Sequence, residues 1–232
     1  MEQKHTAIVM SAGKGSRMKS VRPKQYLDLG GKPVLYYALA AFEESFVDEI
    51  ILVAGKEDIS YCAREIIGRY GFTKTAKIVP GGAERYESVY EGLKAAEDAD
   101  FVYIHDGARP FIDQAVLNRA KDCVLEYGAC AAGMPVKDTI KIADENEFVV
   151  QTPERRRVWQ IQTPQAFSYP LVREAYDRLM AEGGEKTVTD DAMVVEEMTG
   201  HPVKLFAASY ENIKITTPED LRTAAAFLQE NV

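Results

Sequence analysis

The alternation of short apolar runs with helical patterns is the feature that most restricts the fold of this 232-residue chain. Apolar, β-branched runs predict strands at 6–12, 49–55, 76–82, 101–107, 130–136 and 202–208. Helical periodicity predicts helices at 32–45, 57–70, 83–97, 113–127, 169–182, 190–199 and 217–230. Several strands are apolar on both faces, which is typical of parallel sheets covered by helices on both sides. We therefore expect a single α/β domain over 1–232, Rossmann-like, with a mainly parallel twisted sheet.

One region interrupts this alternation. The stretch 138–162, "DTIKIADENEFVVQTPERRRVWQIQ", predicts two short strands joined by a polar turn at 144–147, followed by a return strand. A hairpin with so little core of its own is marginal in water. We expect the segment 138–160 to be a projecting β-arm that packs against a second copy of the chain in a homodimer. A loop folded back on its own domain is the alternative.

Composition and charge exclude several classes of protein. The net charge of −8 disfavours broad binding to nucleic acid or to anionic membranes, so any bound anion must meet a local cluster of positive charge. The three cysteines have no CxxC spacing, which favours reduced thiols over a metal site or a disulfide framework. No apolar run is long enough for a signal peptide or a membrane span. The expected location is the cytoplasm.

The segment after the first predicted strand, "SAGKGSRMKSVRPKQ" (11–25), supplies such a cluster. It is not a Walker loop, because Gly15 follows Lys14, and it lacks the third glycine of a dinucleotide fingerprint, where Met18 stands. Gly13 and Gly15 still allow a close backbone approach to phosphate oxygens. A glycine turn with a solvated basic face is the alternative interpretation.

A series of motifs then matches a known family. "SAGKGSRM" and "PKQYLDLGGKPVL" resemble the opening of the sugar-phosphate nucleotidyltransferases. The chain is most similar to the 2-C-methyl-D-erythritol 4-phosphate cytidylyltransferases of non-mevalonate isoprenoid synthesis. The similarity continues in order through "GGAERYESV" (81–89), "HDGARPF" (105–111), "PVKDTIK" (135–141), "QTPQAF" (162–167), "TDDA" (189–192) and "NIKITTPEDL" (212–221).

The resemblance implies transfer of the cytidylyl group of CTP to a polyol phosphate, with release of pyrophosphate and no covalent enzyme intermediate. It places the catalytic charges on Arg17 and Lys24, beside the α-phosphorus. It assigns nucleotide binding to Ser11, Ala12, Gly13, Gly15, Gly82, Arg85, Ser88, Asp106 and Ala108. Mg²⁺ would be held mainly by the CTP phosphates, with Asp106 contacting it directly or through its water. His105, beside it, is expected to be a packed strand residue rather than a general base.

The resemblance also implies an acceptor site, assigned to Arg109, Thr139, Arg155, Thr163, Thr189 and Lys214. Three consecutive arginines leave the register open, so Arg156 or Arg157 could replace Arg155. If Arg155 lies on the arm and Lys214 on the core, the site is completed across the dimer.

Two alternatives to this function stay open. A ribitol-5-phosphate cytidylyltransferase shares almost every motif, because both acceptors are polyol phosphates. A non-catalytic CTP-binding regulator of the same fold would need neither Arg17 nor Lys24 at the α-phosphorus. A dinucleotide dehydrogenase is disfavoured by Met18.

Overall fold

The computed structural model spans the chain and describes residues 3–13, 18, 22–183 and 188–230. Its main sheet is formed by β1 (His5–Ser11), β4 (Glu49–Ala54), β5 (Thr75–Pro80), β6 (Phe101–Asp106), β7 (Ala129–Pro135), β10 (Trp159–Ser168) and β11 (Lys204–Ala207). The helices are α1 (Val34–Glu43), α2 (Ile59–Tyr61), α3 (Arg85–Ala95), α4 (Gln114–Tyr127), α5 (Tyr169–Ala181), α6 (Asp191–Thr199) and α7 (Pro218–Glu230). Short 3-10 helices are η2 (Lys24–Tyr26), η3 (Lys56–Asp58) and η5 (Arg155–Arg157).

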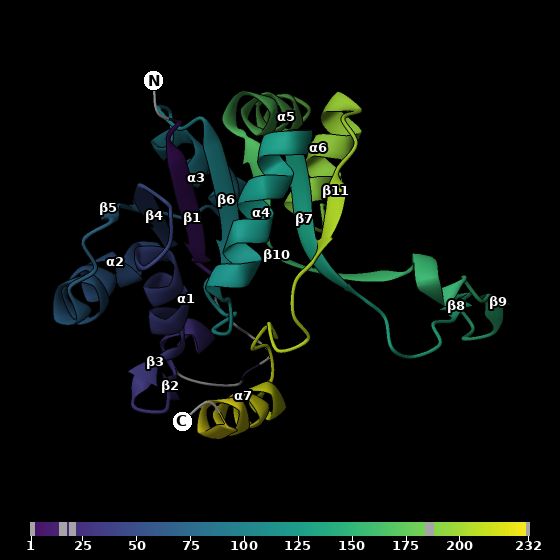
Figure 1. The fold of residues 1–232 in the computed structure, drawn as a ribbon, viewed down its shortest axis with the longest axis horizontal. Coiled ribbons are helices and arrows are strands. Elements are labelled where there is room, and N and C mark those ends of the chain that lie inside the picture. The colour runs from purple at the N-terminus through teal and green to yellow at the C-terminus, as the bar shows by residue number, and fades with distance from the viewer. Residues whose placement is uncertain (1–2, 14–17, 19–21, 184–187, 231–232) are drawn as a thin grey trace.

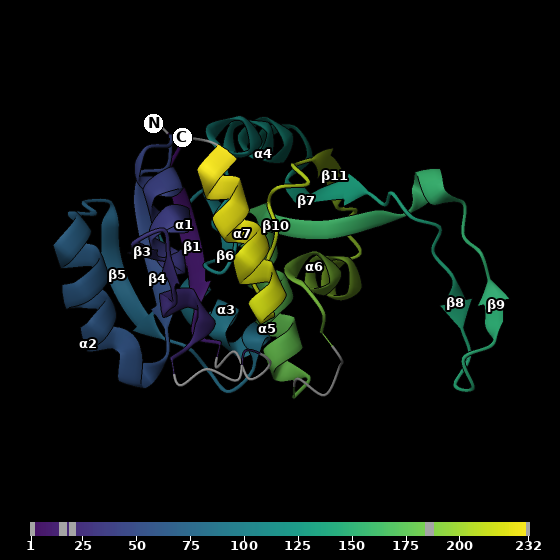
Figure 2. The same cartoon turned by 90° about the horizontal axis from the view of Figure 1, so that it is seen from below.

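The sheet has the order β11-β7-β10-β6-β1-β4-β5, and only β10 runs antiparallel to its neighbours. Helices cover both of its faces (Figures 1 and 2). Alternate residues of β1 belong to different cores: Ala7 and Val9 pack with α1 and α4, whereas Ile8 packs with α3, α5 and α6. The predicted α/β fold with a mainly parallel sheet is confirmed.

The order of the strands places a ligand site at β1. The chain passes from β1 to β4 and β5 on one side and then returns to β6 on the other side. In open α/β sheets, ligands bind beyond the carboxyl ends of the strands where the order reverses in this way. Ser11 ends β1 and Asp106 ends β6, so these residues lie at that position.

The predicted return strand is longer and more central than its sequence indicates. We expected it to end by 162, but β10 continues to Ser168 and inserts between β6 and β7. Its stretch Gln162–Gln165 has polar side chains and a proline, which is unusual for a central strand, and the pairing with β7 shifts register there. Buried hydrogen bonds of Gln162, Thr163 and Gln165 compensate for this composition.

The arm extends away from the sheet in both views (Figures 1 and 2). Its strands β8 (Ile142–Ala143) and β9 (Val149–Gln151) form a separate two-stranded sheet. Side chains on it are exposed, including the apolar Phe148, Val149 and Val150.

Two helix predictions need correction. The helix predicted from residue 32 begins at Val34, because Lys32 and Pro33 form β3, which pairs with β2 (Asp28–Leu29) around two glycines with positive φ. Half of the helix predicted at 57–70 is a π-helix, η4 (Cys62–Gly68), rather than an α-helix. The predicted start of α7 is confirmed: the Asp220 carboxylate accepts the N–H groups of Thr216 and Thr217 at 2.8 Å.

The contact between α3 and the sheet gives a first testable prediction. A Cβ atom at Gly92 would lie 2.6 Å from Ile8 Cγ2 and 3.0 Å from Val53 Cγ2, so this glycine lets the helix approach the strands closely. We expect Gly92→Ala to lower the free energy of unfolding by ~1–3 kcal/mol in denaturant titrations, because a close-packed core resists added volume. The neighbouring variant Glu91→Ala, at a half-buried residue paired with Lys94 at 2.8 Å, should lower it by less than ~1 kcal/mol. Equal stability of the two variants would contradict the packing described.

Candidate active site

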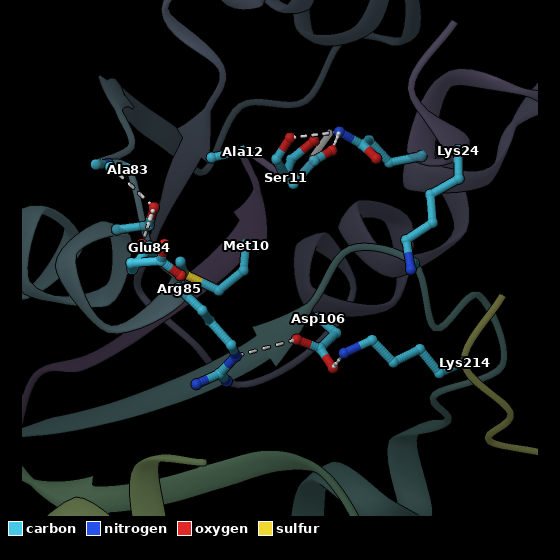
Figure 3. Close-up of a pocket in the computed structure, with 14 residues that line it drawn as sticks. Met10, Ser11, Ala12, Lys24, Ala83, Glu84, Arg85, Asp106 and Lys214 are labelled. Carbon is cyan, nitrogen blue, oxygen red and sulfur yellow. Dashed lines mark hydrogen bonds and ion pairs between the residues drawn. The ribbon is translucent and has the colours of Figure 1, made fainter. Parts of the chain in front are cut away.

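A cavity of about 450 Å³ opens at the carboxyl edge of the sheet, between the ends of β1 and β6 and the start of α3 (Figure 3). All the described residues predicted to bind the nucleotide line it: Ser11, Ala12, Gly13, Gly82, Arg85, Ser88, Asp106 and Ala108. Lys24 and Lys214 line it as well, and their side chains enter from the same side. The predicted residues Gly15 and Arg17 lie outside the described part of the chain.

The end of β1 is anchored to the segment that carries Lys24. Gln25, next to Lys24 in η2, is buried and donates from Nε2 to the carbonyl oxygens of Ser11 (2.6 Å) and Gly13 (3.0 Å). The hydroxyl groups of Ser11 and Tyr26 are 3.3 Å apart. From the sequence, Gly13 was predicted to bind the nucleotide and Lys24 to lie beside its α-phosphorus, whereas Gln25 was not assigned a role.

The second wall of the cavity is the loop 81–84 and the start of α3. Gly81 lies so close to the β1 loop that a Cβ atom there would be 2.4 Å from Ala12 Cβ. Ser88 accepts the N–H of Gly82 at 3.0 Å and donates to the Glu84 carbonyl at 3.0 Å. The Ser88 hydroxyl hydrogen is therefore engaged in holding this loop and cannot be donated to a nucleotide at the same time.

Asp106 lies at the inner end of the cavity, surrounded by cations. Its Oδ2 is 2.8 Å from Lys214 Nζ and 3.6 Å from Arg109 Nε, and its Oδ1 is 3.8 Å from Arg85 Nε. Burial acts to raise the pKa of Asp106, but Lys214, Arg85 and Arg109 together hold it well below its usual range. Asp106 is therefore ionised at neutral pH.

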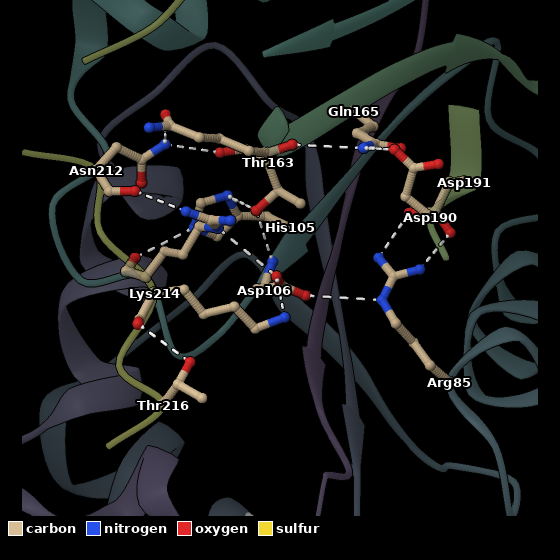
Figure 4. Close-up of polar contacts among 12 residues, drawn as sticks. Arg85, His105, Asp106, Thr163, Gln165, Asp190, Asp191, Asn212, Lys214 and Thr216 are labelled. Atoms are coloured by element: carbon tan, nitrogen blue, oxygen red, sulfur yellow. Dashed lines mark hydrogen bonds and ion pairs between the residues drawn. The ribbon is translucent and has the colours of Figure 1, made fainter. Parts of the chain in front are cut away.

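A second cavity of about 310 Å³ adjoins the first and shares Arg85, Asp106 and Lys214 with it (Figure 4). Its other walls include Arg109, Thr163 and Thr189, which were predicted to bind the acceptor. Two ligands could thus lie on either side of one group of charges.

Thr163 reaches this second cavity with a fixed hydrogen-bonding pattern. His105 Nε2 lies 3.2 Å from the carbonyl oxygen of Arg109, which can only accept, so the ring hydrogen is assigned to Nε2. His105 Nδ1 then accepts from the Thr163 hydroxyl at 3.1 Å, and Thr163 Oγ1 also accepts the N–H of Asp106 at 3.0 Å. Burial lowers the pKa of His105 to about 4, so the ring is neutral near pH 7. The expectation of a packed histidine is confirmed, and Thr163 can offer the cavity only a lone pair.

A buried polar network supports the second cavity and was missed from the sequence. The side-chain amide of Asn212 donates from Nδ2 to Gln162 Oε1 (3.0 Å) and to the Thr163 carbonyl (2.9 Å), and the backbone carbonyl of Asn212 accepts from Arg109 Nη1 at 2.7 Å. Gln165 donates to Asp190 at 2.9 Å, at the start of α6. The motif "QTPQAF" marks this network in the sequence.

Arg85 connects the two cavities to α6. Its guanidinium donates to both carboxylate oxygens of Asp191, at 2.8 and 2.7 Å. Asp191 is fully buried and also accepts from the Tyr176 hydroxyl at 2.6 Å. Arg85 is thus held between Asp106 and Asp191, which leaves its guanidinium little freedom to move towards a bound nucleotide.

Two predicted acceptor residues lie away from these cavities. Thr139 and Arg155 are exposed on the arm, where Arg155 Nη1 donates to the Lys137 carbonyl at 3.2 Å. Arg156 pairs with Glu154. Within one chain, the structure therefore does not bring Arg155 to Lys214.

The donor set limits how a cation could bind. No group of three His, Cys, Asp or Glu side chains that could hold a metal ion is present in the described part of the chain. Asp106 is the carboxylate common to both cavities, and its Oδ1 is the oxygen less closely approached by cations. Proteins usually bind Mg²⁺ through one or two carboxylates, and the phosphates of the substrate supply further ligands. The residues present fit an ion of that kind.

The buried ion pair gives a second prediction. Asp191→Asn should lower the free energy of unfolding by about 3 kcal/mol, because it leaves Arg85 partly buried beside an uncharged partner. Glu174→Gln, which breaks the exposed Arg178–Glu174 pair on α5, should cost less than ~1 kcal/mol. Denaturant titrations measure both. A smaller loss for Asp191→Asn than for Glu174→Gln would contradict the role given to this pair.

Comparisons with known proteins agree with this geometry. Residues 5–230 match the family model for 2-C-methyl-D-erythritol 4-phosphate cytidylyltransferase. The protein of that name from Lachnospira eligens is 53% identical over 97% of this chain and 99% of its own. The one from Lachnoclostridium phytofermentans is 51% identical over 99% of this chain and 98% of its own.

Solved structures have the same fold over nearly the whole chain. The crystal structure of 4-diphosphocytidyl-2C-methyl-D-erythritol synthase from Anaerococcus prevotii is 35% identical, with a TM-score of 0.85 over 98% of this chain and 96% of that one. The structure of the 2-C-methyl-D-erythritol 4-phosphate cytidylyltransferase from Thermus thermophilus is 30% identical in sequence, with a TM-score of 0.77 over 99% of this chain and 100% of that one. The sequence, the fold and both cavities thus agree, and the chain belongs to the 2-C-methyl-D-erythritol 4-phosphate cytidylyltransferase family.

Proposed function

We propose that this protein transfers the cytidylyl group of CTP to 2-C-methyl-D-erythritol 4-phosphate, giving 4-diphosphocytidyl-2-C-methyl-D-erythritol and pyrophosphate, in isoprenoid synthesis. One observation carries the proposal: two adjoining cavities share Arg85, Asp106 and Lys214. A nucleotide in the first and a phosphorylated acceptor in the second would meet at these charges. Membership of the family supports the same reaction.

The reaction is a displacement at phosphorus. An oxygen of the acceptor phosphate attacks the α-phosphorus of CTP, the bond to the β-phosphate oxygen breaks, and pyrophosphate leaves with the electron pair. Such chemistry needs positioning and positive charge rather than a covalent intermediate. We assign triphosphate binding to the loop at 11–13 and to Lys24, which line the first cavity, with Arg17 as the second catalytic charge.

No general base is required, because a phosphate monoester is already anionic near neutral pH. The residues agree with this. Asp106 is tied to Lys214, and the Nδ1 atom of the neutral His105 is occupied by Thr163. Neither is arranged to remove a proton from a substrate.

Lys214 and Arg109 are the proposed cations for the acceptor phosphate, with Thr189 beside them. Thr163 can accept a hydrogen bond but has no hydrogen left to donate, so we assign it to a hydroxyl group of the polyol rather than to the phosphate. The acidic body of the molecule makes these local cations the attractive region for anionic substrates.

Mg²⁺ is proposed as the cofactor, held by the CTP phosphates and by Asp106 directly or through water. When bound, it would neutralise charge that builds up on the phosphates. A cytoplasmic location is also proposed. In the described part of the chain no helix is long and apolar enough to cross a membrane.

A homodimer through the arm is proposed because the arm exposes apolar side chains and lacks a core. Phe148 is 72% exposed, and Val149 and Val150 are 58% and 62% exposed. Packing against a second copy would bury these side chains. It would also allow Thr139 and Arg155 of one copy to reach the acceptor cavity of the other.

Pyrophosphate release tests the proposed function. Enzyme, CTP and Mg²⁺ should release pyrophosphate with 2-C-methyl-D-erythritol 4-phosphate and far less with ribitol 5-phosphate. Faster release with ribitol 5-phosphate would identify that compound as the acceptor and contradict the acceptor proposed above. CTP binding without release in either case would favour the non-catalytic regulator.

The role of Lys24 gives a third prediction. Lys24→Ala should lower kcat by roughly a hundredfold or more, about 3 kcal/mol of barrier, because charge on the leaving pyrophosphate loses its partner. Circular dichroism should show a folded protein. Lys56→Ala, an exposed lysine outside both cavities, should be unchanged. A near-normal rate for Lys24→Ala would remove this residue from the mechanism.

The shared acceptor site gives a fourth prediction. Arg155→Ala should raise the KM for the acceptor more than that for CTP, whereas Arg156→Ala, paired with Glu154, should leave both nearly unchanged.

Mixing the Arg155→Ala and Lys214→Ala proteins under conditions that exchange subunits should restore activity. Random pairing makes half of the dimers mixed, and each mixed dimer has one intact site, so about a quarter of the wild-type rate is expected. No recovery, with exchange verified by mass spectrometry, would contradict a site shared between two chains.

A further inference from the structure

The short helix η2 contacts the end of β1 through successive side chains. Lys24 lines the nucleotide cavity, and Gln25 donates to two carbonyls of the β1 loop. Tyr26 is buried, and its hydroxyl lies 3.3 Å from both Ser11 Oγ and Cys62 Sγ. The cation and the loop proposed to bind one triphosphate are therefore joined directly to each other.

A loop binds phosphate when its N–H groups face the anion and its carbonyl groups do not. At the end of β1 and in this loop, three carbonyls are engaged elsewhere. The Met10 oxygen accepts the N–H of Gly107 at 2.8 Å, and the oxygens of Ser11 and Gly13 accept from Gln25. In a trans peptide the C=O and the next N–H point in opposite directions, so the N–H of Ala12 points away from Gln25.

Gln25 is suited to this task by its burial and its chemistry. The residue is 2% exposed, so water cannot easily take over the hydrogen bonds that its amide donates. A primary amide is uncharged and has two N–H donors on one nitrogen. One donor is thus available for each of the two carbonyl oxygens that accept from Nε2. A lysine there would donate but would add charge, and a glutamate would add an acceptor beside two others.

We propose that Gln25 is a positioning residue for the triphosphate: it holds the Ser11 and Gly13 carbonyls away from the phosphates and fixes Lys24 relative to the loop. The inference rests on the proposed function, because it assumes that the triphosphate lies in the first cavity. Without Gln25, the two carbonyls would have to turn towards water in that cavity, where they would repel an anion.

Gln25→Met tests this, because methionine has a similar length but no donor. We expect the KM for CTP and the Ki of pyrophosphate as a competitor of CTP to rise together, by roughly ten- to hundredfold for two lost hydrogen bonds. The KM for the acceptor should stay within about twofold. This division separates positioning of phosphates from a general loss of structure.

Gln114→Met is the matched control. Gln114 is a partly buried glutamine that likewise donates from Nε2 to a backbone carbonyl, that of Ala41 at 2.8 Å, outside both cavities. It should leave all three constants unchanged. If Gln25→Met behaves like Gln114→Met while the wild type turns over, the inference is overturned; if the wild type itself releases no pyrophosphate, the proposed function fails instead.

A second variant covers the case in which Gln25→Met does not fold. Gln25→Glu has the same shape but no donor at neutral pH. It should raise the KM for CTP and the Ki of pyrophosphate at least as much as Gln25→Met does. A parallel rise in the KM of both substrates, or loss of folding in both variants, would leave Gln25 a purely structural role and overturn the proposal.

Discussion

The cluster of Asp106 with Lys214, Arg109 and Arg85 is the interaction on which the rest of the site depends. It places three cations around one buried carboxylate at the point where two cavities meet. Each cation comes from a different part of the chain: Arg85 from α3, Arg109 from the loop after β6, and Lys214 from the segment after β11. The cluster therefore ties the end of β6 to α3 and to the segment after β11. An acidic molecule thereby keeps positive charge available for two anionic ligands.

The surrounding structure keeps these charges in place with buried hydrogen bonds. Asp191, at the start of α6, accepts from Arg85, and the hydroxyl of Tyr176 on α5 donates to Asp191. The Asn212 carbonyl holds Arg109 and the Asn212 amide joins it to β10, while His105 fixes the hydroxyl of Thr163. These hydrogen bonds restrict the motion of the side chains, which is the property that a site for phosphoryl transfer needs. Arg109 Nε and Asn212 Oδ1 are buried atoms of this network without a hydrogen-bond partner among the described residues.

The sequence predicted the strands and helices well where periodicity and apolar runs are strong, as in β4, whose six residues are all buried. It failed for β10, because Gln162, Thr163 and Gln165 are polar and their burial depends on partners distant in the chain. The motifs assigned residues to both cavities but could not show that Ser88 and Arg85 are already engaged. Gln25 and Asn212 lie within the motifs "PKQYLDLGGKPVL" and "NIKITTPEDL" but were assigned no role, because a motif does not show which backbone carbonyl a side chain contacts.

A crystal structure with CTP, Mg²⁺ and the acceptor bound tests the central claim most directly. The account predicts the triphosphate in the cavity lined by Ser11–Gly13 and Lys24, the acceptor phosphate beside Arg109, and the α-phosphorus between them, next to Lys214 and Asp106. A triphosphate bound elsewhere, or both phosphates on the same side of Asp106, would contradict it.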